Sequence, residues 1–337
     1  MTKMNIRKIL LWTLAAGLCA GAFSCKKDSE EDTRITLRGT LTFSIPPYVA
    51  PGEVFELVPS VIKKQDGGTP GIYWAFSFIP SIRDTTRYEN GTGDGAIILE
   101  VPDTLTSLTV TCAAFAEGYY NTTGSSTVAV VHGQETLSGL GLPDDVSVFE
   151  DPRDGRLYPY VEIGGLEWFT RNLACDGGAF YRDAAAMQDV FGQYYSWEEA
   201  SQSCPDGWRL PDAQDWAALV AAAGGTETED GICPGISGSL MADAYMAEKK
   251  MWEFFPEVKI TNDLLFCALP TGYAVDAQGT HVFYGLSEYS VFWTAEEAED
   301  EDYAYCRNLY VASPDVFKSA MHKETFLAPV RCVRDVE

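Results

Sequence analysis

The segment WTAEEAEDEDYAY (293–305) carries a run of carboxylates, which are the side chains that hard cations prefer as ligands. Calcium is the cation that such oxygen ligands would bind, and the four candidate ligands are Glu296, Glu297, Glu299 and Asp300. A calcium site also requires its carboxylates to converge in space, which a bare acidic run does not ensure. A solvated acidic loop is therefore the interpretation that we favour, and no cofactor is expected.

Side chains suited to covalent or acid–base catalysis are sparse. Nucleophilic catalysis requires a thiol or hydroxyl beside a base, and the chain has only three histidines, His132, His281 and His322. None of them lies in a GxSxG or other triad motif, and the sequence contains no HExxH, P-loop or dinucleotide-binding motif. The sequence therefore does not predict an enzyme.

The N-terminal residues have the features of a secretory signal that ends in a lipidated cysteine. Basic residues precede an apolar run at 9–23, which is too short and wrongly flanked for a stable membrane span. The residues AFSC (22–25) resemble a bacterial lipobox, whose cysteine is lipidated and becomes the new N-terminus after cleavage. We therefore expect a signal peptide at 1–24 and a lipid on Cys25.

The segment KKDSEEDT (26–33) is polar and acidic, so residues 25–33 are expected to form a flexible lipidated tether. An acidic run in this position resembles the surface-display signal of Bacteroidetes lipoproteins. We therefore expect a protein of the outer membrane that is exposed on the cell surface and contacts the membrane through its lipid anchor only. The net charge of −25, from 24 Lys and Arg against 49 Asp and Glu, argues against nucleic acid as a partner.

Residues 34–132 are predicted to form an all-β domain, because segments rich in Thr, Val, Ile and aromatic residues alternate with turn sequences. In SLTVTCAAF (107–115) every second residue from Leu108 onward faces one side, which makes Cys112 a core residue. About six or seven short strands in about 100 residues are typical of an immunoglobulin-like β-sandwich. A linker containing Gly, Pro and acidic residues is expected at 133–150.

The pattern then changes to helices followed by short strands. Ser196 and Glu199 can form a capping box for one helix, and Asp212 can cap a second helix that ends at Gly224. Between the two helices, Arg209 is flanked by apolar residues. We expect it to hold a buried carboxylate or carbonyl groups rather than a ligand.

Six sequence pieces occur in the same order as in a known family. They are DPRDGRLYPYVEIGGLEWFTRNLA (151–174), GQYYSWEEA (192–200), CPDGWRLPDAQDWAAL (204–219), FCALPTGY (266–273), VFWTAEE (291–297) and APVRCVRD (328–335). Together they resemble the Fibrobacter succinogenes major paralogous domain over residues 151–337. That family is similar to the C-type-lectin-like and formylglycine-generating-enzyme fold group, so the resemblance implies an α+β C-type-lectin-like domain.

The resemblance also implies a disulfide between Cys204, at the end of the first helix, and Cys332, near the last strand. Seven cysteines follow Cys25, and an exported protein can form disulfides. The weaker pairing hypotheses are Cys267 with Cys306 and Cys175 with Cys233.

In C-type-lectin-like domains, variable loops between the helices and the last strands carry ligands. Here these loops span about 226–263 and 276–302, and the candidate ligand rim is Tyr245, Trp252 and Phe254. The spacing of these aromatic residues fits a helical core stripe equally well, and we favour the core. The EPN, QPD and WND motifs of calcium-dependent lectins are absent.

These patterns predict a non-catalytic recognition or adhesion module whose extracellular ligand is a glycan or a protein. A structural or accessory component of an outer-membrane assembly is the alternative. An enzyme of the formylglycine-generating type is the function that we favour least. The copper-binding cysteine pair of those relatives cannot be placed on this sequence.

Overall fold

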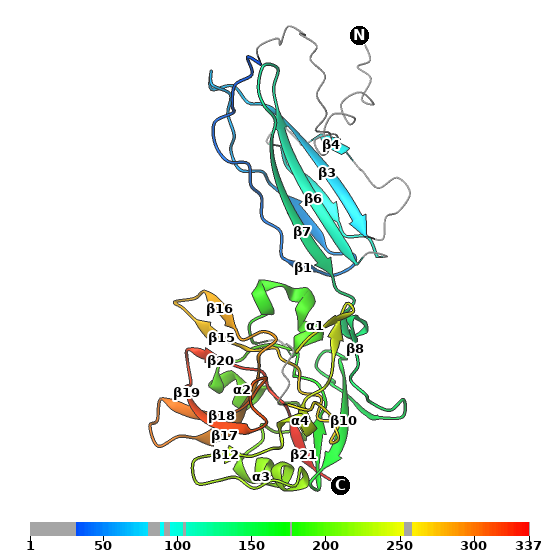
Figure 1. Cartoon of the computed structure of the whole chain (residues 1–337), viewed down its shortest axis with the longest axis vertical. Coiled ribbons are helices and arrows are strands. Elements are labelled where there is room, and N and C mark those ends of the chain that lie inside the picture. The colour runs from blue at the N-terminus through cyan, green and yellow to red at the C-terminus, as the bar shows by residue number, and fades with distance from the viewer. Residues whose placement is uncertain are drawn as a thin grey trace, which may run out of the picture.

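The structure is a computed structural model of the chain, and it describes residues 32–79, 88–90, 95–103, 106–175, 177–252 and 258–336. The predicted signal peptide, Cys25 and the tether up to residue 31 lie outside the described residues, as does Phe254. Two strand-rich units follow one another along the long axis of the molecule (Figure 1). No helix in the described ranges is both long and apolar enough to cross a membrane.

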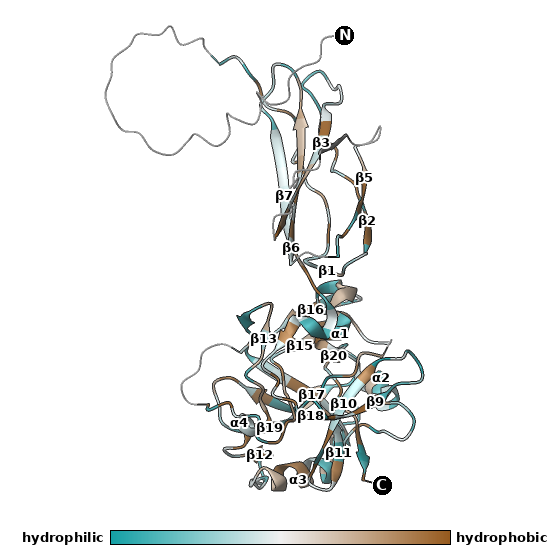
Figure 2. Cartoon of the chain, turned by 90° about the vertical axis from the view of Figure 1, so that its right-hand side faces the viewer, coloured by the Kyte–Doolittle hydropathy of each residue, from teal (hydrophilic) through white to brown (hydrophobic). Residues whose placement is uncertain are grey.

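Two sheets form the described part of the first unit. Their strands are β1 (Tyr48–Val49), β2 (Val54–Leu57), β3 (Gly71–Ile79), β4 (Tyr88–Asn90), β5 (Ile97–Glu100), β6 (Ser107–Phe115) and β7 (Thr122–Val130). The larger sheet has the order β1-β7-β6-β3-β4, and the smaller one pairs β2 with β5. β1 runs parallel to β7, whereas the other neighbours are antiparallel. Figure 2 shows β2 and β5 standing opposite β6 and β7.

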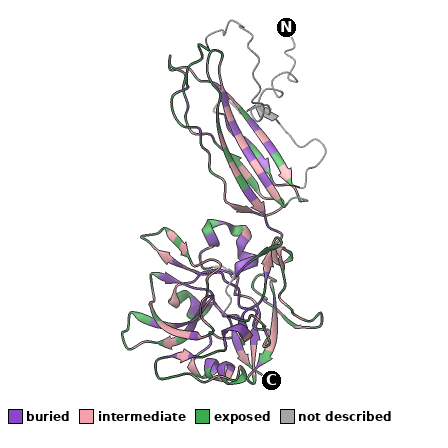
Figure 3. Cartoon of the chain, in the orientation of Figure 1, coloured by how far each residue is buried: buried purple, intermediate pink, exposed green. Residues whose placement is uncertain are grey.

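These two sheets enclose one apolar core. Side chains along β6 alternate between buried and half-buried from Leu108 onward (Figure 3), which confirms the predicted period of two. Cys112 is fully buried, as expected of a core residue. Trp74 on β3 is buried beside it, and its Nε1 donates a hydrogen bond to the carbonyl oxygen of Gly95 (2.7 Å). Because Leu99 on β5 joins the same cluster from the smaller sheet, the unit is a β-sandwich.

The second unit combines short helices with further sheets. The helices are η3 (Gly133–Thr136), η4 (Tyr181–Asp183), η5 (Ala185–Met187), α1 (Gln188–Phe191), α2 (Trp197–Ser203), α3 (Ala213–Ala222) and α4 (Ser237–Leu240). The strands are β8 (Leu137–Ser138), β9 (Ser147–Glu150), β10 (Leu157–Ile163), β11 (Leu166–Phe169), β12 (Ile232–Cys233), β13 (Tyr245–Met246), β14 (Lys249–Lys250), β15 (Tyr273–Asp276), β16 (His281–Tyr284), β17 (Tyr289–Glu297), β18 (Tyr303–Tyr310), β19 (Val316–His322), β20 (Phe326–Leu327) and β21 (Val333–Asp335). They form sheets in the orders β21-β11-β10-β9, β12-β19-β18-β17, β16-β15-β20 and β14-β13-β8.

Residues 133–150 fold onto the second unit, although their composition predicts a linker. β8 pairs with β13, and β9 pairs with β10. Nδ2 of Asn262 donates a hydrogen bond to the carbonyl oxygen of Leu140 (2.9 Å). The rings of Tyr48 and Tyr181 also meet at the junction of the units, with centroids 5.9 Å apart. The two units are therefore joined by a packed connection.

Both helices that flank the CPDGWRLP sequence begin as predicted. At α2, Oγ of Ser196 accepts from the backbone N–H of Glu199, and the Glu199 carboxylate accepts from the backbone N–H of Ser196 (2.8 Å). At α3, Asp212 and Asp215 form the equivalent reciprocal pair. Gly224 follows α3 with a φ of +78°, a conformation that ends helices and favours glycine. Local sequence therefore sets where both helices start and stop.

The disulfide implied by the family resemblance is present, since Cys204 and Cys332 are bonded and their Cα atoms are 5.8 Å apart. The four cysteines of the weaker pairing hypotheses remain thiols: Cys175, Cys233, Cys267 and Cys306. Both of those pairings are wrong, because each would join residues of different apolar clusters.

Arg209 holds a buried carboxylate, as predicted. Its Nη2 lies 2.7 Å from Oδ1 of Asp215, whose side chain is 5% exposed, and 3.1 Å from Oδ1 of Asp335. Burial raises the pKa of Asp215, and the positive charge of Arg209 partly opposes that rise. The ion pair therefore keeps a carboxylate charged inside the fold.

Replacing Arg209 by methionine should make the protein less stable, and more so at pH 7 than at pH 4. The pKa of Asp215 is higher in the folded protein than in the unfolded chain. Its contribution to the free energy of unfolding therefore falls as the pH rises from the unfolded-state pKa through the folded-state pKa. Removing the guanidinium raises the folded-state pKa of Asp215 further. The pH range over which stability is lost becomes wider, so the variant loses more stability at pH 7 than at pH 4. Urea unfolding at both pH values tests this, with Arg38→Met on the exposed surface of the first unit as control. Equal losses at the two pH values would contradict the prediction.

Candidate functional site

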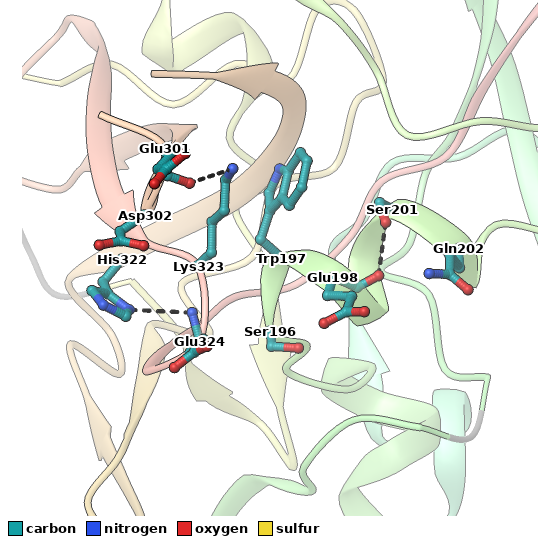
Figure 4. A pocket seen from close by; sticks show the side chains of 10 residues that line it. All are labelled: Ser196, Trp197, Glu198, Ser201, Gln202, Glu301, Asp302, His322, Lys323 and Glu324. Atoms are coloured by element: carbon teal, nitrogen blue, oxygen red, sulfur yellow. Dashed lines mark hydrogen bonds between the residues drawn. The ribbon is translucent and has the colours of Figure 1, made fainter. Parts of the chain in front are cut away.

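An open pocket of about 590 Å³ lies where α2 meets two turns between late strands (Figure 4). Residues of 196–202 line one side, and residues 301–302 and 322–324 line the other. We call this cavity the Trp197 pocket, after the half-buried indole at its centre. Its volume falls within the roughly 300–1,000 Å³ typical of sites for small ligands.

Hydrogen bonds hold the walls of the Trp197 pocket in place. The backbone N–H of Trp197 donates a hydrogen bond to the carbonyl oxygen of Lys323 (3.0 Å). The backbone N–H of Lys323 donates in turn to the carbonyl oxygen of Asp302 (2.9 Å). The indole Nε1 of Trp197 donates to the carbonyl oxygen of Thr294 (2.9 Å). The Lys323 ammonium lies 4.5 Å from the centroid of the Trp197 ring and contacts the carboxylate of Glu297 (2.5 Å). The ring is therefore positioned before any ligand arrives.

The Trp197 pocket is acidic. Four carboxylates line it, from Glu198, Glu301, Asp302 and Glu324, whereas Lys323 supplies one ammonium group. Nδ1 of the lining residue His322 accepts a hydrogen bond from the backbone N–H of Glu324 (3.2 Å). This arrangement repels anions and offers carboxylate oxygens to the hydroxyl or ammonium groups of a ligand.

The four carboxylates considered as candidate calcium ligands do not converge. Glu296 pairs with Lys318, and Glu297 pairs with Lys323. Oδ1 of Asp300 accepts from the backbone N–H of Asp302 (3.1 Å) in the turn after β17. Glu299 is exposed beside them. Because these groups bind lysines and backbone amides, the geometry fits a solvated acidic loop.

Among the described residues, one group of three metal-type ligands has its ligand atoms within 4.8 Å of one another, namely Asp151, Asp154 and Cys175. Arg153 already binds both carboxylate oxygens of Asp151, and Arg156 binds Asp154 (2.6 Å). The two guanidinium groups neutralise the carboxylates, so this group is an ion-pair cluster.

The predicted ligand rim does not form one surface. Trp252 is 1% exposed and packs in the core cluster that contains Trp216 and Phe266. Tyr245 is half-buried in β13, where it pairs with Ser138. The core interpretation that we favoured from the sequence therefore holds for Trp252. The helical spacing was wrong, because Tyr245–Met246 and Lys249–Lys250 form the paired strands β13 and β14.

A second cavity, of about 420 Å³, lies between the β17–β18–β19 sheet and the β15–β20 pair. We call it the aromatic groove, and its lining is Tyr273, Tyr289, Val291, Asn308, Ser319, Met321 and Phe326. The ring of Tyr273 stacks on that of Phe326, with centroids 5.0 Å apart, and Tyr289 stacks on Tyr310 (4.6 Å). None of the lining side chains carries a formal charge at neutral pH.

A buried arginine, Arg331, joins distant segments of the second unit by hydrogen bonds. Nε of Arg331 donates to Oδ1 of Asn172 (2.8 Å), and its Nη1 and Nη2 donate to the carbonyl oxygens of Phe169 (3.0 Å), Phe266 (2.5 Å) and Cys267 (2.8 Å). Burial lowers the pKa of Arg331 to about 9, so the guanidinium remains charged at neutral pH. The carbonyl dipoles, rather than a carboxylate, offset its charge.

Sequence reasoning singled out neither cavity. Trp197 lies in the GQYYSWEEA piece and Arg331 in APVRCVRD, so their presence in family-like motifs was an available signal. Asn308 and Ser319 lie in no such piece. Only the pairing of β18 with β19 brings them side by side.

In structural terms, the chain is a β-sandwich packed against a disulfide-bonded α+β unit that carries two open cavities. It belongs to the Fibrobacter succinogenes major domain family, whose model matches residues 161–334, about half of the chain. The matched region contains both cysteines of the disulfide and the linings of both cavities. A comparison with curated proteins finds no match.

Proposed function

We propose that this protein is a non-catalytic recognition module held on the outside of the cell by a lipid on Cys25. Its ligand is an extracellular glycan or protein. The observation that carries this proposal is the Trp197 pocket, where a fixed indole and several polar side chains face an open cavity. Such a mixture of one aromatic anchor and convergent polar groups is typical of binding sites.

The arrangement of the units supports a display role. The first unit is proposed to be an immunoglobulin-like spacer, on the basis of its two packed sheets. The second is proposed to be C-type-lectin-like, on the basis of its two early helices, its late strands and the Cys204–Cys332 disulfide. A lipid anchor in the outer membrane would then hold the first unit next to the membrane and place the second unit farther away.

Binding by the full chain to glycan and protein arrays tests the proposal. Trp197→Ala should weaken the binding at least tenfold, because it removes the aromatic anchor of the pocket. The double variant Glu198→Ala/Gln202→Ala changes exposed lining residues only, and it should weaken binding with the fold intact. Glu117→Ala, on the exposed surface of the first unit, is the matched control.

The array experiment also separates the alternatives. Binding that survives a chelator would support recognition without calcium. Unchanged binding in both pocket variants would show that the ligand contacts another surface. An absence of any ligand, together with co-purification of outer-membrane proteins, would favour the accessory role. Copper in the purified protein would favour an enzyme of the formylglycine-generating type.

A further inference from the structure

We propose that the aromatic groove binds a neutral pyranose ring of a glycan. This inference rests on the proposed recognition role but concerns a cavity separate from the Trp197 pocket. The groove is lined by aromatic rings, by one amide and by three hydroxyl groups, those of Ser319 and the two tyrosines, and it has no charged lining residue. The class of ligand follows from the position, the stacking, the hydrogen-bonding capacity and the charge of these side chains.

Strand register creates the polar part of the groove. Asn308 on β18 lies directly opposite Val291 on β17, so both side chains point to the same face of the sheet. Ser319 on β19 lies directly opposite Cys306 on β18. Cys306 is two residues before Asn308, so the side chains of Ser319 and Asn308 point to the same face of the sheet. The amide and the hydroxyl are consequently neighbours in the lining of the groove.

The aromatic walls are rigid. Tyr273 is stacked between Phe326 and Tyr284, with centroids 5.0 Å and 5.7 Å away. Both faces of Tyr273 are thereby covered, whereas Tyr310 stacks on one face of Tyr289, whose ring is nearly perpendicular to that of Tyr273. The negative face of an aromatic ring attracts the weakly positive C–H groups of a sugar ring, so the sugar is proposed to stack on Tyr289. Because the rings support one another, binding would require little further ordering of side chains.

Asn308 and Ser319 retain hydrogen-bonding capacity. Nδ2 of Asn308 donates to Oγ of Ser319 (2.9 Å). An amide also has a carbonyl oxygen, and a serine hydroxyl also has a proton to donate. The Asn308 side chain also hydrogen-bonds the thiol of Cys306, whereas among the described residues no acceptor is recorded for the hydroxyl proton of Ser319. A sugar hydroxyl can accept that proton and can donate to the amide oxygen of Asn308.

The lack of charge selects against other ligands. A charged group in this groove would lose water without meeting an opposite charge. A purely apolar side chain would take water from the Ser319 hydroxyl proton without accepting it, which is also unfavourable. A ring with apolar C–H faces and neutral hydroxyl edges matches both parts of the groove. Four carboxylates line the Trp197 pocket instead.

Titration of the full chain with neutral monosaccharides tests this assignment. The probes are methyl α-D-glucopyranoside, methyl α-D-mannopyranoside and N-acetyl-D-glucosamine, at concentrations suited to Kd values of about 1 mM. Saturation-transfer NMR should show ring C–H protons of at least one probe receiving magnetisation from aromatic protons of the protein. Asn308→Ala should weaken that binding about tenfold and Ser319→Ala a few-fold. Asn121→Ala, at an exposed position of the first unit, should leave it unchanged.

Three results would overturn the assignment. If N-acetyl-phenylalanine amide binds and no sugar does, the groove accepts an apolar peptide side chain. If sugars bind equally to wild type, to Asn308→Ala and to the milder Ser319→Ala, they occupy another surface. If the arrays identify a ligand but no neutral sugar binds, the recognition role stands and this inference fails.

Discussion

Replacing Arg331 by alanine is expected to lower the free energy of unfolding by about 4 kcal/mol or more. The side chain is fully buried, and its removal leaves acceptors on four residues without a donor. It also leaves a cavity beside Phe266 and Phe292, whose ring centroids lie 4.8 Å and 5.3 Å from the guanidinium carbon. Urea titration followed by tryptophan fluorescence measures the change.

A second variant and a matched control make this prediction decisive. Arg331→Lys keeps the charge but offers three donors from one point, so we expect a loss of about 2 kcal/mol. Arg334→Ala removes a half-buried arginine three positions away that pairs with Glu167 and lies over the ring of Trp208, and it should cost about 2 kcal/mol, less than Arg331→Ala. Similar losses for alanine at 331 and at 334 would show that the buried bonds do not stabilise the fold as proposed.

Removing the Cys204–Cys332 disulfide is expected to lower the free energy of unfolding by about 2–5 kcal/mol. The bond closes a loop of 128 residues, so its loss gives the unfolded chain much more freedom. It also ties the end of α2 to the segment that leads into β21. Cys204→Ala/Cys332→Ala, compared with wild type by urea unfolding, provides the measurement.

Reducing agent supplies the control for the disulfide experiment. Dithiothreitol should destabilise the wild-type protein about as much as the double substitution does, and it should not affect the double variant. Cys175→Ser, which removes a thiol that forms no disulfide, should remain sensitive to dithiothreitol. A wild-type protein whose stability is the same with and without reductant would contradict the prediction.

Local sequence was sufficient to predict features that depend on residues close together in the chain, such as helix starts and the alternation of side chains along a strand. The capping boxes of Ser196 and Asp212 needed only residues three positions away, and both were predicted. The alternation along β6 was equally visible, because a strand between a core and solvent exposes every second side chain. The disulfide followed from the order of family-like motifs, not from any local pattern.

Distant partners were the features that sequence reasoning missed. The composition of residues 133–150 predicted a linker, yet β8 pairs with a strand more than 100 positions later. Nothing near Tyr245 signals that pairing. The weaker cysteine pairings failed for a related reason, since spacing along the chain does not reveal which apolar cluster surrounds each thiol.

The sequence by itself determined the helix caps, the family and the class of the first unit as β-rich. These properties depend on neighbouring residues or on ordered motifs, which are readable along the chain. The tertiary structure alone decided which side chains share a cavity, because Trp197, Lys323 and Asp302 come together through backbone bonds between distant segments. Asn308 and Ser319 likewise meet through strand register, and a shift of one residue would turn one of them to the opposite face.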